Sequence, residues 1–275
     1  MKTRLLGLLS ETPIHVGAGE STGFLDLPVA REAATDYPVI PGSGLKGALR
    51  DLARSRGWDE PKRKAVFGSQ DAAGDLLISD GRLLLLPVRS LHGAFRWVTC
   101  PHLLERLERD TRRAGQPVQC ADVLLPGEDQ CLAAGNGSLF LEERQFTISG
   151  PVPRAVMDAV RPFFFHSPTA DRLTERLVIL HDNAFAWFAR YGLMVSARNV
   201  LDEDKKTSKN LWYEEAVPPD ALFYALVAER RQGTDALQEL LDLFAEVPYL
   251  QVGGNETVGH GVLAVQVLGN HGGGV

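Results

Sequence analysis

Cysteine is scarce in this 275-residue chain, and its few positions exclude two classes of protein. Cys100, Cys120 and Cys131 are odd in number and have no CxxC spacing, so we expect neither a disulfide framework nor a four-cysteine zinc site. The histidines are scattered, and none forms an HExxH pair that would place two metal ligands on one helix face. The three thiols are therefore predicted to be reduced and buried.

Long hydrophobic runs are also missing. No apolar stretch approaches the roughly 18 residues that a membrane helix requires. The short run from Leu5 to Leu9 ends at Glu11 and Pro13, before any small-residue cleavage site, so we do not expect a signal peptide. The sequence therefore predicts a cytoplasmic protein with no membrane partner.

An excess of positive charge is absent too, because 29 Lys and Arg stand against 35 Asp and Glu, a formal net charge of −6. This balance argues against an evenly basic surface, although it allows a basic groove on an acidic body. Hydrophobic residues at 44% and charged residues at 23% are ordinary globular values, which argue against a disordered chain. The length allows one large domain or a core domain with insertions.

The hydrophobic pattern predicts an α+β fold in a single domain over residues 1–275. Continuous apolar runs favour strands, and helical spacing of apolar residues favours helices. The predicted strands cover 3–10, 83–88, 94–99, 221–228 and 262–268, and the predicted helices cover 43–57, a segment starting at Pro101, 182–191 and 234–246. Without insertions, this order of strands and helices is the ferredoxin-like pattern.

Three further segments stand apart from this pattern. Residues 114–152 contain several Gly and Pro between short apolar runs, and they predict an irregular insertion. Residues 193–215 predict a hairpin with a charged tip. The glycine-rich residues 269–275 predict a disordered tail. In the helix that follows residue 100, arginines such as Arg106 alternate with acidic residues and are expected on a solvated face.

A glycine-rich turn at the start of a helix carries the first candidate binding site, with Ser43 as the expected N-cap. Gly42-x-Gly44-x-x-Gly47 matches the dinucleotide fingerprint, but the preceding strand is a stub and the region about 20 residues later lacks a second strand. Exposed helix N–H groups together with Lys46 and Arg50 favour an anion, most simply a phosphate. A turn whose glycines serve only packing is the alternative.

A polar loop, residues 11–38, follows the first strand and is long for a structureless segment in a compact domain. It contains His15 and Asp26. A single loop aspartate is commonly a turn former, and no nearby carboxylate completes a two-metal pair. The residues alone therefore predict a flexible polar loop near a phosphate site.

Short motifs follow one another in a fixed order over nearly the whole chain. They are Pro41-Gly-Ser-Gly-Leu-Lys-Gly-Ala-Leu-Arg50, Val66-Phe-Gly68, Leu86-Pro-Val-Arg-Ser90, Gly93-Ala-Phe95, Val98-Thr-Cys-Pro101, Leu211-Trp-Tyr-Glu-Glu215, Pro218-Pro-Asp-Ala-Leu-Phe-Tyr224 and Gly253-Gly-Asn-Glu-Thr-Val-Gly-His-Gly261. One glycine motif would be unspecific, but the co-linear set resembles the RAMP-superfamily backbone subunits of type III-B CRISPR effector complexes, the Cmr complexes.

The resemblance implies both a fold and an activity. The fold would be a modified ferredoxin-like, RRM-related palm with inserted subdomains, and the 193–215 hairpin would be a protruding thumb. Copies of the chain would stack head to tail along a CRISPR RNA with other Cmr subunits. Complementary single-stranded target RNA would be cut at regular intervals with a divalent metal ion, Mg²⁺ or Mn²⁺.

The resemblance also implies roles for individual residues. The family's catalytic aspartate falls on Asp26, which would hold the metal or accept a proton. His15 and Glu215 are weaker candidates that would orient the loop or support the thumb. The implied RNA contacts are Ser43, Lys46, Arg50, Gly253, Gly254, Lys205, Lys206 and Lys209. Gly44 stands where the family commonly has Ser, so a side-chain contact is lost at that position.

Three other hypotheses remain open from the sequence. The chain could be a non-catalytic subunit that only scaffolds guide RNA. It could be the equivalent type III-A subunit, although the Pro87-Val-Arg-Ser90 and Val98-Thr-Cys-Pro101 strings favour the III-B form. A dinucleotide-dependent enzyme is the remaining alternative, and it depends on the glycine fingerprint alone.

Overall fold

The computed structural model describes residues 2–19, 25–123, 125–202, 204–205, 207–231 and 233–269. The strands are β1 (Thr3–Ser10), β2 (Val39–Ile40), β3 (Leu76–Ile78), β4 (Gly81–Arg89), β5 (Phe95–Thr99), β6 (Gln130–Leu132), β7 (Ser138–Leu141), β8 (Arg144–Gly150), β9 (Leu177–Leu180), β10 (Met194–Leu201), β11 (Ser208–Ala216), β12 (Leu222–Glu229), β13 (Tyr249–Gln251) and β14 (Val262–Val267). The α-helices are α1 (Gly42–Ser55), α2 (Glu60–Phe67), α3 (Pro101–Arg113), α4 (Arg154–Val160), α5 (Ser167–Asp171), α6 (Leu173–Arg176), α7 (Asp182–Tyr191) and α8 (Ala236–Asp242). Short 3-10 helices are η1 (Arg161–Phe163) and η2 (Glu256–Val258).

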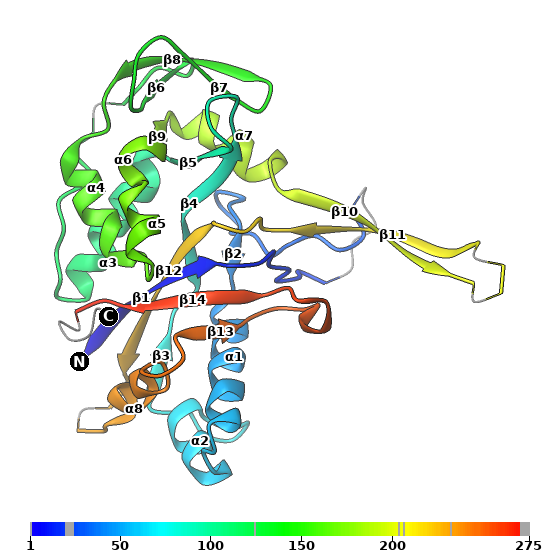
Figure 1. Cartoon of the computed structure of the whole chain (residues 1–275). Helices are drawn as coiled ribbons and strands as arrows, with labels where there is room; N and C mark the ends of the chain where they lie inside the picture. The colour runs from blue at the N-terminus through cyan, green and yellow to red at the C-terminus, as the bar shows by residue number, and fades with distance from the viewer. Residues whose placement is uncertain are drawn as a thin grey trace.

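One long mixed sheet runs through the body of the molecule (Figure 1). Its strands lie in the order β13-β14-β1-β12-β4-β5-β9-β6-β8-β7. β1 pairs antiparallel with both β12 and β14, and β4 pairs antiparallel with β12. β12 is buried at every position, and it is hydrophobic without alternation from Leu222 to Ala228 before it ends at the buried Glu229. Strands far apart in the sequence therefore form the centre of the fold.

Helices cover both faces of the sheet. α1 and α8 pack on one face against alternate residues of β1 and β12, and α3, α4 and η1 pack on the other. Leu6 and Leu8 of β1 contribute to the first core, whereas Leu5 and Leu9 contribute to the second. Because successive strand residues point to opposite faces, the leucine run in β1 stabilises both cores at once.

Gly7 lies at the point where η1 crosses β1. A Cβ atom on Gly7 would lie 2.1 Å from the backbone oxygen of Phe163. Glycine in a strand interior normally lowers stability, and its presence often marks a close backbone approach. Here it allows the η1 turn to lie directly on the central strand.

The structure confirms most of the elements predicted from hydrophobic pattern. The predicted helix 182–191 coincides with α7, and the predicted strands at 3–10, 83–88, 94–99, 221–228 and 262–268 overlap β1, β4, β5, β12 and β14. The prediction that 114–152 is irregular was wrong for residues 130–150, where β6, β7 and β8 extend the main sheet, whereas the described residues of 114–129 form no helix or strand. β6 and β7 are only three and four residues long, too short for a reliable period.

The N-terminus of α1 differs from its prediction. Pro41, not Ser43, is the N-cap residue, and no side chain of the cap residue accepts a hydrogen bond. Instead Asp80, in the turn before β4, accepts a 2.7 Å hydrogen bond from the Gly42 N–H. A carboxylate from a distant segment therefore satisfies one of the free N–H groups at this helix end.

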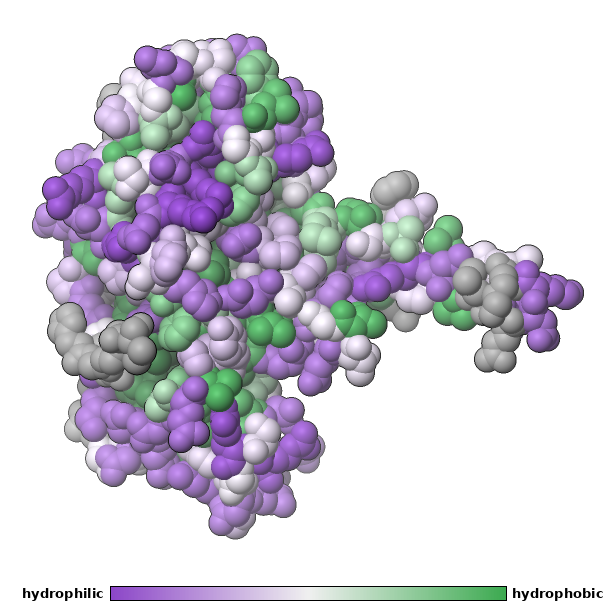
Figure 2. Space-filling model, viewed as in Figure 1, coloured by the Kyte–Doolittle hydropathy of each residue, from purple (hydrophilic) through white to green (hydrophobic). Residues whose placement is uncertain are grey.

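The segment predicted as a hairpin forms β10 and β11, which pair antiparallel from Met194 with Ala216 to Leu201 with Ser208. The two strands form a separate sheet that projects away from the body (Figures 1 and 2). Of the predicted tail 269–275, only Gly269 belongs to the described residues. None of the described helices is long and apolar enough to cross a membrane.

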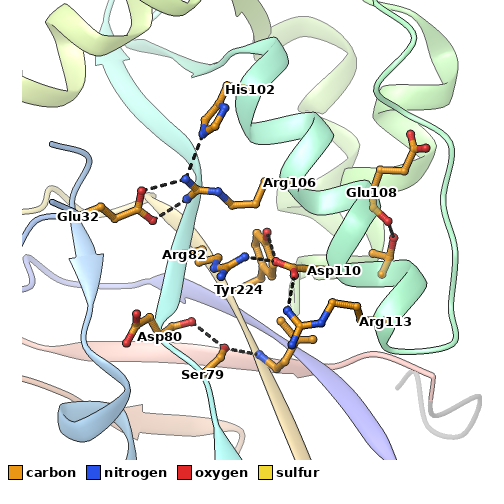
Figure 3. Close-up of polar contacts among 12 residues, drawn as sticks. Glu32, Ser79, Asp80, Arg82, His102, Arg106, Glu108, Asp110, Arg113 and Tyr224 are labelled. Carbon is orange, nitrogen blue, oxygen red and sulfur yellow. Dashed lines mark hydrogen bonds and ion pairs between the residues drawn. The ribbon is translucent and has the colours of Figure 1, made fainter. Parts of the chain in front are cut away.

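The inner face of α3 carries a polar network rather than a solvated arginine row, which corrects the sequence prediction for Arg106 (Figure 3). Arg106 donates two hydrogen bonds to the Glu32 carboxylate, at 2.5 and 2.9 Å. Lower on the helix, buried Asp110 accepts from Arg82 at 2.6 Å and from the Tyr224 hydroxyl at 2.9 Å. These contacts join α3 to the sheet and to the loop before β2.

Candidate functional site

Asp26 lies at the base of the projecting hairpin. Its Oδ2 atom accepts a 2.7 Å hydrogen bond from the backbone N–H of Tyr213 in β11. The next residue, Leu27, donates to the Tyr213 carbonyl at 3.1 Å and accepts from the Glu215 N–H at 3.0 Å. Asp26 is half-exposed, so a solvent-borne ligand can reach it. The loop is therefore ordered at this aspartate by pairing with β11.

His15 also contacts β11, two residues beyond the contact of Asp26. Its Nδ1 lies 2.7 Å from the carbonyl oxygen of Glu215. Because a carbonyl can only accept, Nδ1 carries the proton, and Nε2 of the neutral ring is then the basic nitrogen. His15 and Asp26 contact β11 at Glu215 and Tyr213. Residues two apart in a strand are separated by roughly 6.5 Å, so these two contacts are close together.

Glu215 is buried and fully engaged. One carboxylate oxygen accepts a 2.6 Å hydrogen bond from Arg31, and the other accepts from the Val29 N–H at 3.0 Å. Both partners belong to the loop that carries Asp26. The arrangement gives Glu215 a structural position beneath the hairpin rather than one facing solvent.

Arg31 fastens that loop to a second element, the C-terminal end of α7. Its Nη1 donates to the carbonyls of Asp36 and Ala189, each at 2.8 Å. Glu32, beside it, forms the ion pair with Arg106 of α3 described above. Burial alone would raise the pKa of Glu32, but the hydrogen bond and charge of Arg106 outweigh it and hold that pKa below its ordinary value.

The glycine-rich turn after β13 lies against His15. The Gly254 N–H donates to the His15 carbonyl at 2.9 Å, and a Cβ on Gly253 would lie 2.3 Å from the same oxygen. Gly253 also has φ of 84°, which favours glycine. Asn255 then donates to the buried carboxylate of Glu214. The structure thus brings Gly253 and Gly254 to the site, where they pack against His15.

The start of α1 presents an exposed surface with Ser43, Lys46 and the adjoining glycines. Lys46 and Arg50, together with Lys64 of α2, line a cavity of about 520 Å³. The Nη1 atom of Arg50 donates a 2.7 Å hydrogen bond to the Gly68 carbonyl, which positions the guanidinium at the cavity wall. The basic character predicted for this helix is present, and α2 extends it.

The lysines predicted to contact RNA from the hairpin lie near its tip. Lys209 forms a 3.1 Å ion pair with Asp202, and the Lys205 N–H donates to the same carboxylate. These contacts lower the pKa of Asp202, with the Lys205 backbone bond as the main cause. Lys206 lies outside the described residues. Of the aromatic pair Trp212 and Tyr213, neither is buried.

Asp26 alone supplies too few ligands to bind a metal ion, so an ion at this position would take its other ligands from water and substrate phosphate. Among the described residues there is no cluster of three or more His, Cys, Asp or Glu side chains that could hold one. The Tyr213 N–H engages the Oδ2 atom of Asp26. Mg²⁺ is commonly bound by one or two carboxylates plus water and substrate phosphate, and Asp26 fits that pattern.

Sequence reasoning gave no role to three residues that shape this site. Arg31 lies 184 positions from Glu215, so no local pattern connects them. Lys64 reaches the α1 cavity from a helix that was not predicted as a separate element. Asn255 was noticed only as part of a glycine-rich string. A positive charge in an otherwise apolar loop segment was the one available signal for Arg31.

The fold and these loops place the chain in a known class of proteins. It belongs to the RAMP superfamily, whose family model matches residues 8–264. The mixed α/β structure agrees with that assignment.

Within the superfamily, the chain is similar to Cmr4 proteins. It is 32% identical over 99% of both chains to the CRISPR system Cmr endoribonuclease Cmr4 of Pyrococcus furiosus, and 25% identical over 94% of both to the CRISPR system CMR subunit Cmr4 of Saccharolobus solfataricus. The crystal structure of oligomeric Cmr4 from Pyrococcus furiosus matches with a TM-score of 0.78 at 31% identity, covering 97% of this chain and 98% of that one. By contrast, Csm3 of Enterococcus italicus matches at 33% identity over only 25% of this chain.

Proposed function

We propose that the chain is the backbone subunit of a type III-B CRISPR effector, where it binds CRISPR RNA and cleaves complementary target RNA. The observation that carries this proposal is the end-to-end likeness to a Cmr endoribonuclease. The partners would be CRISPR RNA, single-stranded target RNA, further copies of the chain stacked head to tail, and the other Cmr subunits, all in the cytoplasm. The likeness to Csm3 covers too little of the chain to favour the type III-A form.

The palm and thumb of this proposal correspond to particular elements. The strands β14-β1-β12-β4, with α1 and α8 on one face, would form the ferredoxin-like palm. The β10–β11 hairpin would be the thumb. The hairpin buries little of its surface against the body, and in this proposal it would contact nucleic acid instead (Figure 2).

Asp26 would be the catalytic residue. In the reaction, the 2′-oxygen of one target nucleotide bonds to the adjacent phosphorus and the bond from phosphorus to the 5′-oxygen breaks. The hydroxyl proton passes to a base and the departing oxygen takes a proton from water, leaving a 2′,3′-cyclic phosphate and a 5′-hydroxyl. Asp26 would accept that proton or hold the cation, while His15 and Glu215 keep the loop on β11.

A divalent cation, Mg²⁺ or Mn²⁺, held by Asp26 together with water and the RNA phosphate would stabilise the charge that develops on that phosphate. The chain's own contribution is positioning. A hairpin that splays one nucleotide out of the guide–target duplex can bring its 2′-hydroxyl into line with the phosphate, a geometry that a continuous A-form helix does not offer.

Guide RNA would lie along the start of α1. Lys46 and Arg50 would meet its phosphates, and the exposed N–H groups of Ser43 and Gly44 add donors. The Gly253–Gly254 turn would act indirectly, by fixing His15. Lys205, Lys206 and Lys209 would reach RNA from the hairpin tip.

The decisive experiment replaces Asp26 with Asn in the complex assembled with guide RNA. Target cleavage should be abolished in Mg²⁺ or Mn²⁺, while target binding stays within about twofold, because the amide keeps the shape but loses the charge. Asp158→Asn, at an exposed aspartate of α4, is the matched control and should cut normally. Undiminished cutting by Asp26→Asn would refute the catalytic assignment. Absence of cutting by the native complex would favour the scaffold hypothesis.

A further inference from the structure

The C-terminal end of α7 carries one strongly exposed aromatic ring, Tyr191, next to Trp187, which packs partly against the core. The side chain of Tyr191 is 64% exposed. The half-buried indole of Trp187 lies one helical turn earlier, with a ring-centroid distance of 5.8 Å to Tyr191. The two rings lie next to each other at the surface, with their planes tilted by 56°.

Two arginines lie against these rings. Arg144, at the start of β8, places its guanidinium 5.3 Å from the Trp187 ring and 5.4 Å from Phe146. Arg190 lies 5.9 Å from the Tyr191 ring, and its Nε donates to Asp36 at 2.8 Å. Positive charge therefore lies beside both rings. We call this group the α7 aromatic site (Trp187, Tyr191, Arg144 and Arg190).

The site is continuous with the base of the hairpin. α7 leads into β10 through Gly192 and Leu193 (Figure 1). Arg31, in the loop that carries Asp26, donates to the carbonyls of Ala189 and Arg190 at the end of α7. The same arginine also bonds Glu215 under the hairpin. Arg31 therefore links the end of α7 to the loop that carries Asp26 and to the base of the hairpin.

We propose that the α7 aromatic site is a stacking site for an unpaired base of single-stranded RNA, on the target strand next to Asp26. The proposal depends on the proposed function, which supplies the target strand. Exposed aromatic rings offer faces for base stacking, and neighbouring arginines attract phosphate, which is the combination that single-strand-binding proteins use. A protein partner would favour an uninterrupted apolar surface, whereas here the charged side chain of Arg190 lies beside the Tyr191 ring.

The test measures target-RNA affinity of the guide-loaded complex carrying Tyr191→Ala, Tyr191→Leu or Tyr191→Phe. Stacking of one base predicts an affinity loss of about 5- to 100-fold for the alanine variant. The phenylalanine variant keeps the ring face and should bind like the native chain, whereas leucine keeps apolar area without a ring and should stay weak. Tyr249→Ala, at another exposed tyrosine in β13, is the control and should change nothing.

Crosslinking provides a second readout. A target RNA carrying 5-iodouridine near the scissile position should crosslink to the peptide that contains Tyr191, and Tyr191→Ala should remove that product. Native affinity in Tyr191→Ala, with cleavage intact, would overturn the stacking site while leaving the proposed function in place. A change in the size of the complex without a change in RNA affinity would also overturn it, because the site would then contact protein. Failure of the native complex to bind target would count against the proposed function instead.

Discussion

Arg31 is the residue on which the position of the Asp26 loop depends most. Its guanidinium bonds the carboxylate of Glu215 and the carbonyls of Asp36, Ala189 and Arg190. The planar fork of arginine can serve several acceptors at fixed angles, which the point charge of lysine cannot. One side chain thus joins the loop, the hairpin and α7.

We predict that Arg31→Ala destabilises the chain by about 3 kcal/mol, because it leaves the buried carboxylate of Glu215 without its counter-ion. The matched control is Arg154→Ala, whose ion pair with Asp158 is exposed and should contribute under about 0.5 kcal/mol. Denaturant unfolding of the full chain measures both. Equal losses in the two variants would show that Arg31 is not an anchor.

The sequence identified Asp26 only through a family resemblance, and the structure explains why. What distinguishes Asp26 from an ordinary turn aspartate is its bond to the Tyr213 N–H, 187 positions away. Such pairings are set by the path of the chain, not by local propensity. Lys46 and Arg50 were accessible from sequence because their spacing on one helix is itself the signal.

At the scale of elements, two glycines of different function can be compared. Gly7→Ala should destabilise the chain by about 2 kcal/mol or more, since the added Cβ would meet the Phe163 oxygen at 2.1 Å and η1 would have to move. Gly47→Ala should stabilise it by about 0.5–1 kcal/mol, because Gly47 is inside α1 and no atom beyond the adjoining helix backbone lies within 4 Å of the new carbon. Thermal unfolding should show shifts of opposite sign. A Gly7→Ala variant as stable as the native chain would contradict the packing described for η1, and a destabilised Gly47→Ala variant would contradict the open surface described for α1.

Element prediction succeeded where hydrophobic period and length were both favourable. β12 and α7 have long unambiguous patterns, and their predicted and observed bounds agree closely. β6 and β7 have too few residues to show a period, and they are strands because β9 and β8 offer them edges. Arg106 was assigned to a solvated face by its neighbours in sequence, but Glu32 from a distant loop makes it an inward-facing residue.

At the scale of the whole molecule, the net charge of −6 is distributed unevenly. Residues 42–67, which form α1 and α2, contain seven Lys or Arg against three Asp or Glu. This basic end includes the cavity between Lys46, Arg50 and Lys64. An acidic chain can therefore bind RNA through one surface, and affinity accumulates when several copies bind one guide.

This distribution predicts how salt affects RNA binding. Each phosphate contact on a single strand contributes about −0.7 to the slope of log affinity against log salt. Lys46→Ala should therefore weaken guide binding and make the slope per bound subunit shallower by about 0.7. Lys62→Ala is the matched control, because that lysine is already paired with Glu239 and lies over Trp58, so its slope should equal that of the native chain. Filter binding of the full chain to guide RNA measures both slopes. The salt concentration should cover roughly 50 to 200 mM, where phosphate contacts dominate the affinity. An unchanged slope in Lys46→Ala would show that the α1 cavity does not hold a guide phosphate.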